Sequence, residues 1–236
     1  MGFQMFFHNN NLNRPKTFSI KFSKKMDQEP TIRCMLVGDG AVGKTSMIIS
    51  YISSGFPSNY YQTAFDVYTG KVRVDGTPLK IQLLDTAGQE EYDRFRSLCY
   101  PHTDVFLLCF SVVNPDSFHN ISTKWIPQLR AHNPTLPIVL VGTQSDLRHD
   151  VNVLVRLDKF QVAPVPAYQA RRLAEQIQAQ DYVECSALTQ KSLKEAFDTA
   201  IFAAIKHKAH RANRLTFLDR VKTFSSVGWR KLFCFV

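Results

Sequence analysis

The sequence has no apolar run that approaches the ~18 residues needed to span a bilayer. Its longest apolar stretch, residues 105–110, has the length of a buried strand. The opening "MGFQMFFHNN" lacks both the basic region and the apolar length of a secretion signal. Five scattered cysteines, an odd number, favour reduced thiols over a disulfide framework. These absences argue against a membrane-spanning protein and against a secreted one.

Acidic residues are too few to balance the 29 Lys and Arg, and the formal net charge is +9. The excess lies at the two ends of the chain. Residues 1–30 hold five basic and two acidic residues, and residues 206–236 hold eight and one. Residues 31–205 hold sixteen and seventeen, so the body is nearly neutral. Because nucleic-acid modules more often carry a basic stripe on the folded surface, we expect no nucleic-acid partner. Basic tails that bind RNA, or that are merely solvated, stay open as alternatives.

Strand-like and helix-like patterns alternate through the middle of the chain. Apolar runs typical of buried strands begin at "TIRCMLV" and recur as "DVFLLCFSV", "LPIVLVGT" and "DYVECSAL". Two further strand-like runs surround Asp75-Gly76, which is a strong hairpin signal. Helical patterns cover residues 44–52, 116–131, 167–178 and 192–206, and a short helix is indicated at 153–159 inside an insertion-like stretch, 149–166. The alternation predicts an α/β fold, a mostly parallel sheet with helices on both faces.

The segment "GDGAVGKTS" matches the phosphate-binding pattern G-x-x-x-x-G-K-[ST]. A polyphosphate needs several backbone N–H groups aimed inward, and side chains there would block its approach. The lysine adds a positive charge for the β and γ phosphates, and the following hydroxyl reaches Mg²⁺. The expected nucleotide-binding residues here are Gly38, Asp39, Gly40, Ala41, Val42, Gly43, Lys44, Thr45 and Ser46. A purely structural glycine turn is the alternative, which the preceding strand and following helix disfavour.

A second motif, "LLDTAGQEEYDRF", follows about forty residues later. Asp85 ends an apolar strand, where its carboxylate can hold the water shell of a metal ion. Gly88 can offer its backbone N–H to a γ-phosphate, and Gln89 can orient an attacking water. Alone, this D-x-x-G pattern is weak, because such turns are common. After a phosphate-binding loop it indicates a nucleoside triphosphatase, with Gln89 as the catalytic residue.

These two motifs together resemble the small GTPases, and the rest of the chain resembles the Rho family. The stretch "FPSNYYQTAFDVY" looks like the first switch and effector loop. The resemblance implies that Phe56 packs near the guanine and Tyr60 closes over the phosphates. It also implies that Thr63 completes the Mg²⁺ shell beside Thr45 and, through water, Asp85. The effector-loop residues it implies are Tyr60, Thr63, Phe65, Asp66 and Tyr68.

Two later segments resemble the loops that read the guanine base. "VGTQSDLR" supplies Thr143, Gln144, Asp146 and Leu147, and "ECSAL" supplies Ser186, Ala187 and Leu188. The resemblance implies that Asp146 accepts hydrogen bonds from the base and that a backbone N–H of the second loop meets guanine O6. Thr143 and Gln144 stand where many GTPases have Asn and Lys. Taken alone, an Asp near a strand end is more often a cap or solvated.

The resemblance covers about residues 31–206 and implies a P-loop GTPase fold with a six-stranded sheet and a Rho-type insert helix. Residues 1–30 then form a flexible leader, and 207–236 a basic, aromatic membrane-targeting tail. The implied protein is a monomeric GTP/GDP switch with Mg²⁺, which hydrolyses GTP slowly and regulates actin and kinase signalling. Its implied partners are exchange factors, GTPase-activating proteins, and kinases with a CRIB-type motif. A nucleotide-binding scaffold without turnover is the alternative.

The tail "WRKLFCFV" suggests attachment to a membrane. Most Rho proteins end in C-a-a-X with a prenylated cysteine, but the fourth residue from the end here is Phe233. The ending resembles the atypical Wrch/Chp branch, which implies palmitoylation of Cys234 instead of prenylation. Its aromatic and basic residues suit the cytoplasmic face of an anionic membrane, at the plasma membrane or an internal one. Docking of the aromatics onto the domain itself is the alternative.

Overall fold

A six-stranded sheet forms the centre of the computed structural model, which describes residues 30–57, 64–74 and 77–211. The strands are β1 (Thr31–Val37), β2 (Phe65–Val74), β3 (Thr77–Thr86), β4 (Val105–Ser111), β5 (Ile138–Thr143) and β6 (Asp181–Glu184). They lie in the order β2-β3-β1-β4-β5-β6. Only β2 and β3 pair antiparallel, whereas the other neighbours are parallel. The predicted hairpin and mostly parallel sheet are confirmed, while Asp75 and Gly76 lie outside the described residues.

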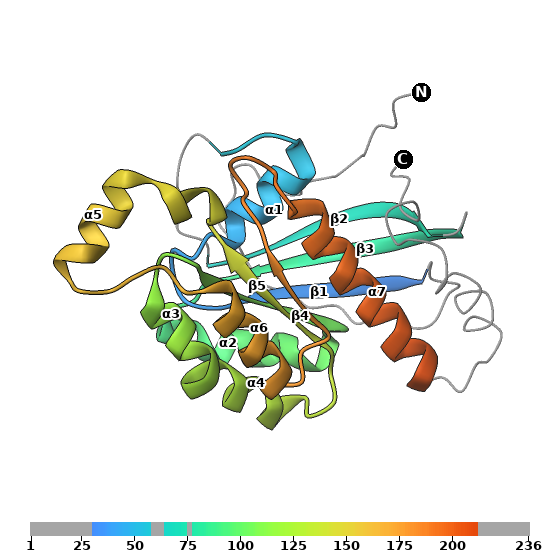
Figure 1. Ribbon diagram of the computed structural model, residues 1–236. Coiled ribbons are helices and arrows are strands. Elements are labelled where there is room, and N and C mark those ends of the chain that lie inside the picture. The colour runs from blue at the N-terminus through green and yellow to red at the C-terminus, as the bar shows by residue number, and fades with distance from the viewer. Residues whose placement is uncertain (1–29, 58–63, 75–76, 212–236) are drawn as a thin grey trace.

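Helices cover both faces of this sheet, as predicted (Figure 1). α1 (Lys44–Ser53) and α7 (Leu193–Arg211) pack on one face, and α2 (Asp93–Cys99), α3 (Pro115–Asn120), α4 (Ile126–His132) and α6 (Ala167–Gln176) lie on the other. α5 (Val151–Lys159) projects from the body and confirms the short helix expected in the insertion. Short 3₁₀ turns occupy Glu90–Tyr92, Tyr100–His102 and Ser145–His149. None of the helices that the structure describes is long and apolar enough to cross a membrane.

The centre of the sheet is buried on both faces, which explains the continuous apolar runs of β4 and β5. Alternate residues of β1 enter two separate cores: Cys34 and Leu36 face α1 and α7, and Met35 and Val37 face the opposite helices. All seven residues of β4 are buried. β4 and β5 therefore carry no polar face whose period would have distinguished them from buried helix segments, whereas Lys80 and Gln82 of β3 alternate with buried residues.

Two helices differ from the sequence expectation. The helix predicted over 116–131 is divided by a π-helical segment, Ile121–Trp125. Pro127 lies just beyond this segment and has no N–H for the ladder, so the backbone pairing changes there. α7 ends at Arg211, five residues past 206, where the sequence pattern places the end of the helix.

Candidate functional site

The loop of residues 38–43 joins β1 to α1 at the carboxyl edge of the sheet. Gly38 has φ +140° and Gly43 φ +94°, conformations that side chains disfavour. A Cβ at Gly38 would lie 2.1 Å from the carbonyl oxygen of Cys109 on β4. Glycine is therefore required for the loop to turn this close to the strand. The first turn of α1 then directs its free backbone N–H groups toward the loop, an arrangement suited to an anion.

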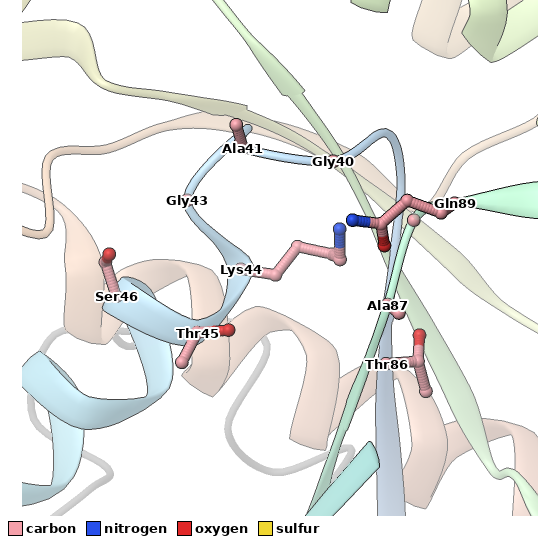
Figure 2. A pocket seen from close by; sticks show the side chains of 10 residues that line it. Gly40, Ala41, Gly43, Lys44, Thr45, Ser46, Thr86, Ala87 and Gln89 are labelled. Carbon is pink, nitrogen blue, oxygen red and sulfur yellow. The ribbon is translucent and has the colours of Figure 1, made fainter. Parts of the chain in front are cut away.

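Lys44 begins α1, and its side chain returns across the loop. Its ammonium donates to the carbonyl oxygens of Gly38, at 2.9 Å, and Asp39, at 2.6 Å. Burial lowers the pKa of this ammonium, and the neighbouring Cys109 and Asp85 oppose the shift only in part. Figure 2 shows the side chain reaching into the space beside Gly40. Lys44 thus places a cation at the centre of this loop, and its contact with the β and γ phosphates stays a prediction.

Thr45 and Asp85 meet where the loop and the end of β3 come together. Asp85 is fully buried and pairs in register with Leu36 of β1, which places it beside the start of α1. The Thr45 hydroxyl donates to Asp85 Oδ2 at 2.7 Å. A hydroxyl and a carboxylate at one point are hard oxygen donors of the kind that Mg²⁺ prefers. The two residues present therefore fit a magnesium ion held partly through water.

Gly88 and Gln89 close the other side of this pocket. A Cβ at Gly88 would lie 2.3 Å from the carbonyl carbon of Asp39 and 2.4 Å from the backbone nitrogen of Gly40. The two backbones therefore approach so closely that no side chain fits between them. The Gln89 amide lies across from Gly40, where a Cβ would be 3.8 Å from Nε2. Lys44 and Gln89 thus face the same space from separate motifs (Figure 2).

Arg96, which the sequence reasoning missed, holds the segment that carries Gln89. Its guanidinium on α2 is 1% exposed. It donates to the backbone carbonyl of Ala87, to the carbonyl of Gln89 at 2.9 Å, and to the Asp93 carboxylate. Burial lowers the pKa of this side chain, yet an arginine stays charged. In the sequence, the only sign of this contact is that Arg96 follows Gln89 by seven residues. That spacing is too weak a signal to predict the contact.

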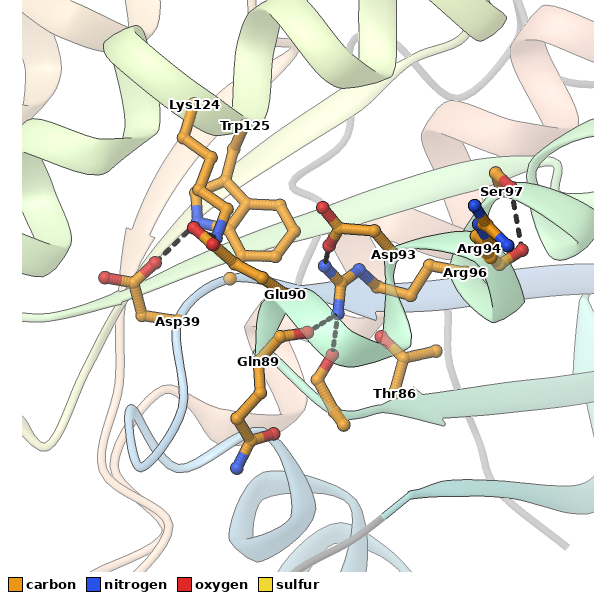
Figure 3. Close-up of polar contacts among 12 residues, drawn as sticks. Asp39, Thr86, Gln89, Glu90, Asp93, Arg94, Arg96, Ser97, Lys124 and Trp125 are labelled. Atoms are coloured by element: carbon orange, nitrogen blue, oxygen red, sulfur yellow. Dashed lines mark hydrogen bonds and ion pairs between the residues drawn. The ribbon is translucent and has the colours of Figure 1, made fainter.

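A second contact joins this region to the phosphate-binding loop (Figure 3). The Arg96 guanidinium lies 5.0 Å from the centre of the Trp125 ring. The Trp125 indole N–H donates to Asp39 Oδ1 at 2.7 Å, and the Asn120 amide donates to Asp39 Oδ2 at 2.7 Å. The Asp39 side chain therefore faces α3 and the π-helical segment. Its backbone carbonyl instead faces the loop, where it accepts from Lys44, and its part in nucleotide binding stays a prediction.

Thr143 and Gln144 connect the expected base loop to the phosphate-binding loop. The Thr143 hydroxyl is buried, 2.5 Å from the Val42 carbonyl and 2.9 Å from the Phe110 carbonyl. Its bonds lie within the protein, so its side chain supports the loops. Gln144 accepts from the Ser111 hydroxyl at 2.5 Å and donates to the Ala41 carbonyl at 3.2 Å. Thr143 is thus placed inside the protein by these bonds, and the part of Thr143 and Gln144 in nucleotide binding stays a prediction.

Asp146 lies beside the second expected base loop. Its Oδ1 accepts a hydrogen bond of 2.5 Å from the Ser186 hydroxyl. The Ser186 oxygen in turn accepts from the Thr189 N–H at 3.0 Å, which fixes the loop. Ser50 of α1 donates to the Ala187 carbonyl at 2.6 Å and joins the same loop to the phosphate-binding helix. Asp146 is thus oriented by its neighbours and is not a helix cap.

The remaining described site residues lie around these two loops. Phe56 is 49% exposed, so the residues that the structure describes cover only about half of it. Leu147 is half-buried and Leu188 exposed. Ser46 points away from Lys44 and Gln89 (Figure 2). Phe65, Asp66 and Tyr68 lie on β2, an edge strand, and burial raises the pKa of Tyr68 to about 12. Tyr60, Thr63 and Cys234 lie outside the described residues.

Comparison with known proteins agrees with this geometry. The profile of the Ras family matches residues 33–206. Proteins described as "Rho-related GTP-binding protein RhoV" from Rattus norvegicus, Mus musculus and Homo sapiens are each 59% identical over 206 residues. The matched region covers 87% of this chain and 87% of each relative.

Proposed function

This chain belongs to the Ras family of small GTPases, among the Rho-related GTP-binding proteins that act as switches, and from this premise we propose how its own residues work. The phosphates of GTP or GDP lie along the backbone of residues 38–43, with Lys44 against the β and γ phosphates. Asp146 accepts from the guanine base, Phe56 covers its edge, and the loop of Ser186, Ala187 and Leu188 offers a backbone N–H. The observation that carries this proposal is one pocket lined by Lys44, Thr45 and Gln89.

Hydrolysis in this pocket needs a positioned water and little covalent chemistry from the protein. We place Gln89 as the residue that orients the water, because its amide faces Gly40 and Lys44. Gly40 leaves room there for the water and for an incoming side chain. No arginine side chain is among the described residues that line the pocket. Hydrolysis is therefore slow until a GTPase-activating protein supplies one.

Mg²⁺ belongs to this proposal through Thr45 and Asp85, with Thr63 as the third residue. When bound, the ion offsets negative charge on the β and γ phosphates. The Thr45–Asp85 hydrogen bond holds both oxygen donors at the edge of β3. We place Asp85 in the outer shell, where its carboxylate would hold the ion through water.

The switch rests on the segments that follow α1 and β3. Thr63 and the Gly88 N–H contact the γ-phosphate, and its loss releases both segments. Effectors then read Tyr60, Thr63 and the β2 residues Phe65, Asp66 and Tyr68. We propose kinases with a CRIB-type motif as effectors and the actin cytoskeleton as an output, together with exchange factors and GTPase-activating proteins as regulators.

A membrane tether completes the proposal. Residues 31–206 act as the GTPase domain after a leader, 1–30, and residues 207–236 attach it to the cytoplasmic face of a membrane. Palmitoylation of Cys234 and the basic residues around it give the two signals that stable anchoring requires. Cys234→Ser is expected to move the full chain from the membrane fraction to the supernatant. Unchanged sedimentation with membranes would exclude acylation at this residue.

Single-turnover hydrolysis separates the switch from a nucleotide-binding scaffold. Gln89→Leu is expected to lower the rate of phosphate release by at least about tenfold, because removing the water-orienting amide costs more than 1.4 kcal/mol of barrier. GTP affinity should stay near that of the wild type, since the residue contacts only the water. Equal rates in the two proteins would contradict catalysis by Gln89.

A further inference from the structure

A second cavity lies at the opposite edge of the sheet from the nucleotide site. It has a volume of about 470 Å³ and lies between the end of α4, the loops that precede β5 and β6, and the last turns of α7. Pro137 precedes β5, whereas the base loop follows the other end of the same strand. A six-residue strand separates the two ends by roughly 15–20 Å. The cavity is therefore distinct from the nucleotide pocket.

The lining of this cavity is basic. Arg130 of α4 and the α7 residues Lys206, His207 and His210 contribute cationic or titratable groups, and none of the lining residues is acidic. Lys206 and His210 are four residues apart on α7, so they share one face of the helix. Gln178, Gln180 and Thr135 add neutral hydrogen-bonding groups. This combination favours an anionic ligand over a cation or an apolar molecule.

The basic groups have two different roles. Arg130 is held in place, since its guanidinium donates to the carbonyls of Pro134, at 3.0 Å, and Leu136, at 2.8 Å. Lys206 and His210 are exposed and form no hydrogen bond or ion pair with any residue that the structure describes. One wall thus supplies a fixed positive charge, and α7 supplies side chains that can turn toward a ligand.

Basic residues also occur in the last turn of a helix to offset its negative end. That explanation suits Lys208, which pairs with Asp104 at 2.8 Å outside the cavity lining. Arg130 and His210 also lie in the last turns of α4 and α7, so they have this role as well. The role does not account for the cavity between these elements, which brings the two helix ends to one space. Asp104 is an acidic residue whose charge reaches His207, but its carboxylate is already paired with Lys208.

We propose that this cavity binds a phosphate-bearing anion, of the kind found in a phosphorylated inositol. Its volume lies within the range of small-ligand sites, about 300–1,000 Å³. Lys206 and His210 contact the phosphate oxygens, and Arg130 contributes its charge from the opposite wall. The ligand comes either as a lipid headgroup at a membrane surface or as a soluble inositol phosphate, since both present the same chemistry.

The test uses the full chain loaded with GDP, at about physiological ionic strength, where weak surface attraction is screened. Inositol 1,4,5-trisphosphate is the soluble probe, measured by calorimetry. Vesicles of phosphatidylcholine with phosphatidylinositol 4,5-bisphosphate are the lipid probe, measured by sedimentation against vesicles of equal charge made with phosphatidylserine.

The cavity variant is Lys206→Gln with His210→Gln, and the control is Lys159→Gln with His149→Gln, which changes the same residue types on exposed sites away from the cavity. Loss of the Lys206 ammonium and of the His210 N–H donor should weaken binding by at least about tenfold in the cavity variant. The control should stay within about twofold, which is under 0.5 kcal/mol. GDP release should be unchanged in both.

The two arms identify the source of the ligand. Loss of binding to both probes, or to the soluble probe alone, supports the site and its phosphate chemistry. Loss confined to phosphoinositide vesicles supports a headgroup that binds only within a membrane. Wild-type affinity of the cavity variant for both probes, or an equal loss in the control, would overturn the proposal.

Discussion

Asp146 is the side chain that we propose sets the specificity of the site for guanine. Its carboxylate comes from the loop after β5 and is held at 2.5 Å by Ser186 from the loop after β6. A carboxylate already oriented in this way loses little entropy when it binds a base. Guanine presents N–H donors at this edge, whereas adenine leaves the charge unpaired, which is costly.

Replacing Asp146 with Asn should reverse the preference for guanine. The amide keeps the shape of the side chain but loses its charge and one acceptor. With two charge-assisted hydrogen bonds lost, GDP should bind at least about a hundredfold more weakly. Xanthosine diphosphate, which presents an acceptor at that edge, should bind the variant better than GDP does.

Equilibrium binding of both nucleotides to wild type and variant measures this change. Asp158→Asn, an exposed carboxylate on α5, is the matched control and should bind GDP normally. GDP affinity within about twofold of the wild type in Asp146→Asn would show that this carboxylate does not read the base.

Arg96 is a positioning residue, because it acts through the backbone that carries Gln89. Lysine in its place keeps the positive charge but cannot reach the Ala87 and Gln89 carbonyls together. Arg96→Lys should slow single-turnover GTP hydrolysis by about tenfold, equivalent to 1.4 kcal/mol of barrier. GTP affinity should change less than that.

The comparison with Arg94→Lys, an exposed neighbour on the same helix, isolates the effect of the buried contact. A merely structural role would lower the melting temperature and leave the hydrolysis rate of the folded protein intact. That result in Arg96→Lys would contradict a positioning role.

At the scale of elements, Arg148, which directly precedes the insertion, links β6 to the end of the insertion. The Arg148 guanidinium donates to both oxygens of Glu184, each at 2.8 Å, and to the Val165 carbonyl at 2.8 Å. Burial alone would raise the pKa of Glu184, but hydrogen bonds from Arg148 and Tyr182 outweigh it, so the pKa is lowered. The carboxylate form is therefore favoured by folding.

This pairing gives the free energy of unfolding a defined pH dependence. Because the folded carboxyl has the lower pKa, its contribution is complete above the unfolded value, about 4.3, and is lost as the pH falls through the folded value. The unfolding free energy of the wild type should exceed that of Glu184→Gln by about 1 kcal/mol near neutrality. This difference in the free energy of unfolding should become smaller below about pH 4.3.

Urea unfolding at a series of pH values tests this dependence. Glu175→Gln, an exposed glutamate on α6, is the control and should show no such difference. A difference between wild type and Glu184→Gln that stays constant down to pH values well below 4 would contradict the assignment.

The order of elements could be predicted because strand and helix signals are local. Apolar strands, a glycine loop and helix periods are each readable within ten residues. α2 is only seven residues long and carries Phe95 and Leu98 exposed, so it lacks the buried stripe that would reveal it. The π-helical segment was not predicted, because it depends on Pro127 together with the burial of Trp125, and burial is not visible in the sequence.

At the scale of the whole molecule, parallel strands bring distant motifs to one edge. The loops after β1, β3, β5 and β6 all follow carboxyl ends of strands, so their order in the sequence indicates a common site. The contacts between these loops could not be predicted. Asp39 with Trp125, and Thr143 with Val42, depend on side chains that are 86 and 101 residues apart.

The most direct measurement is thermal unfolding of the purified chain after its nucleotide is removed with EDTA. GDP with Mg²⁺, well above its dissociation constant, should raise the melting temperature by at least about 5 °C, because ligand binding adds several kcal/mol of stability. ADP with Mg²⁺ should leave the melting temperature unchanged, since Asp146 stays unpaired against adenine. Absence of a shift with GDP, or an equal shift with ADP, would contradict a guanine nucleotide site at residues 38–46.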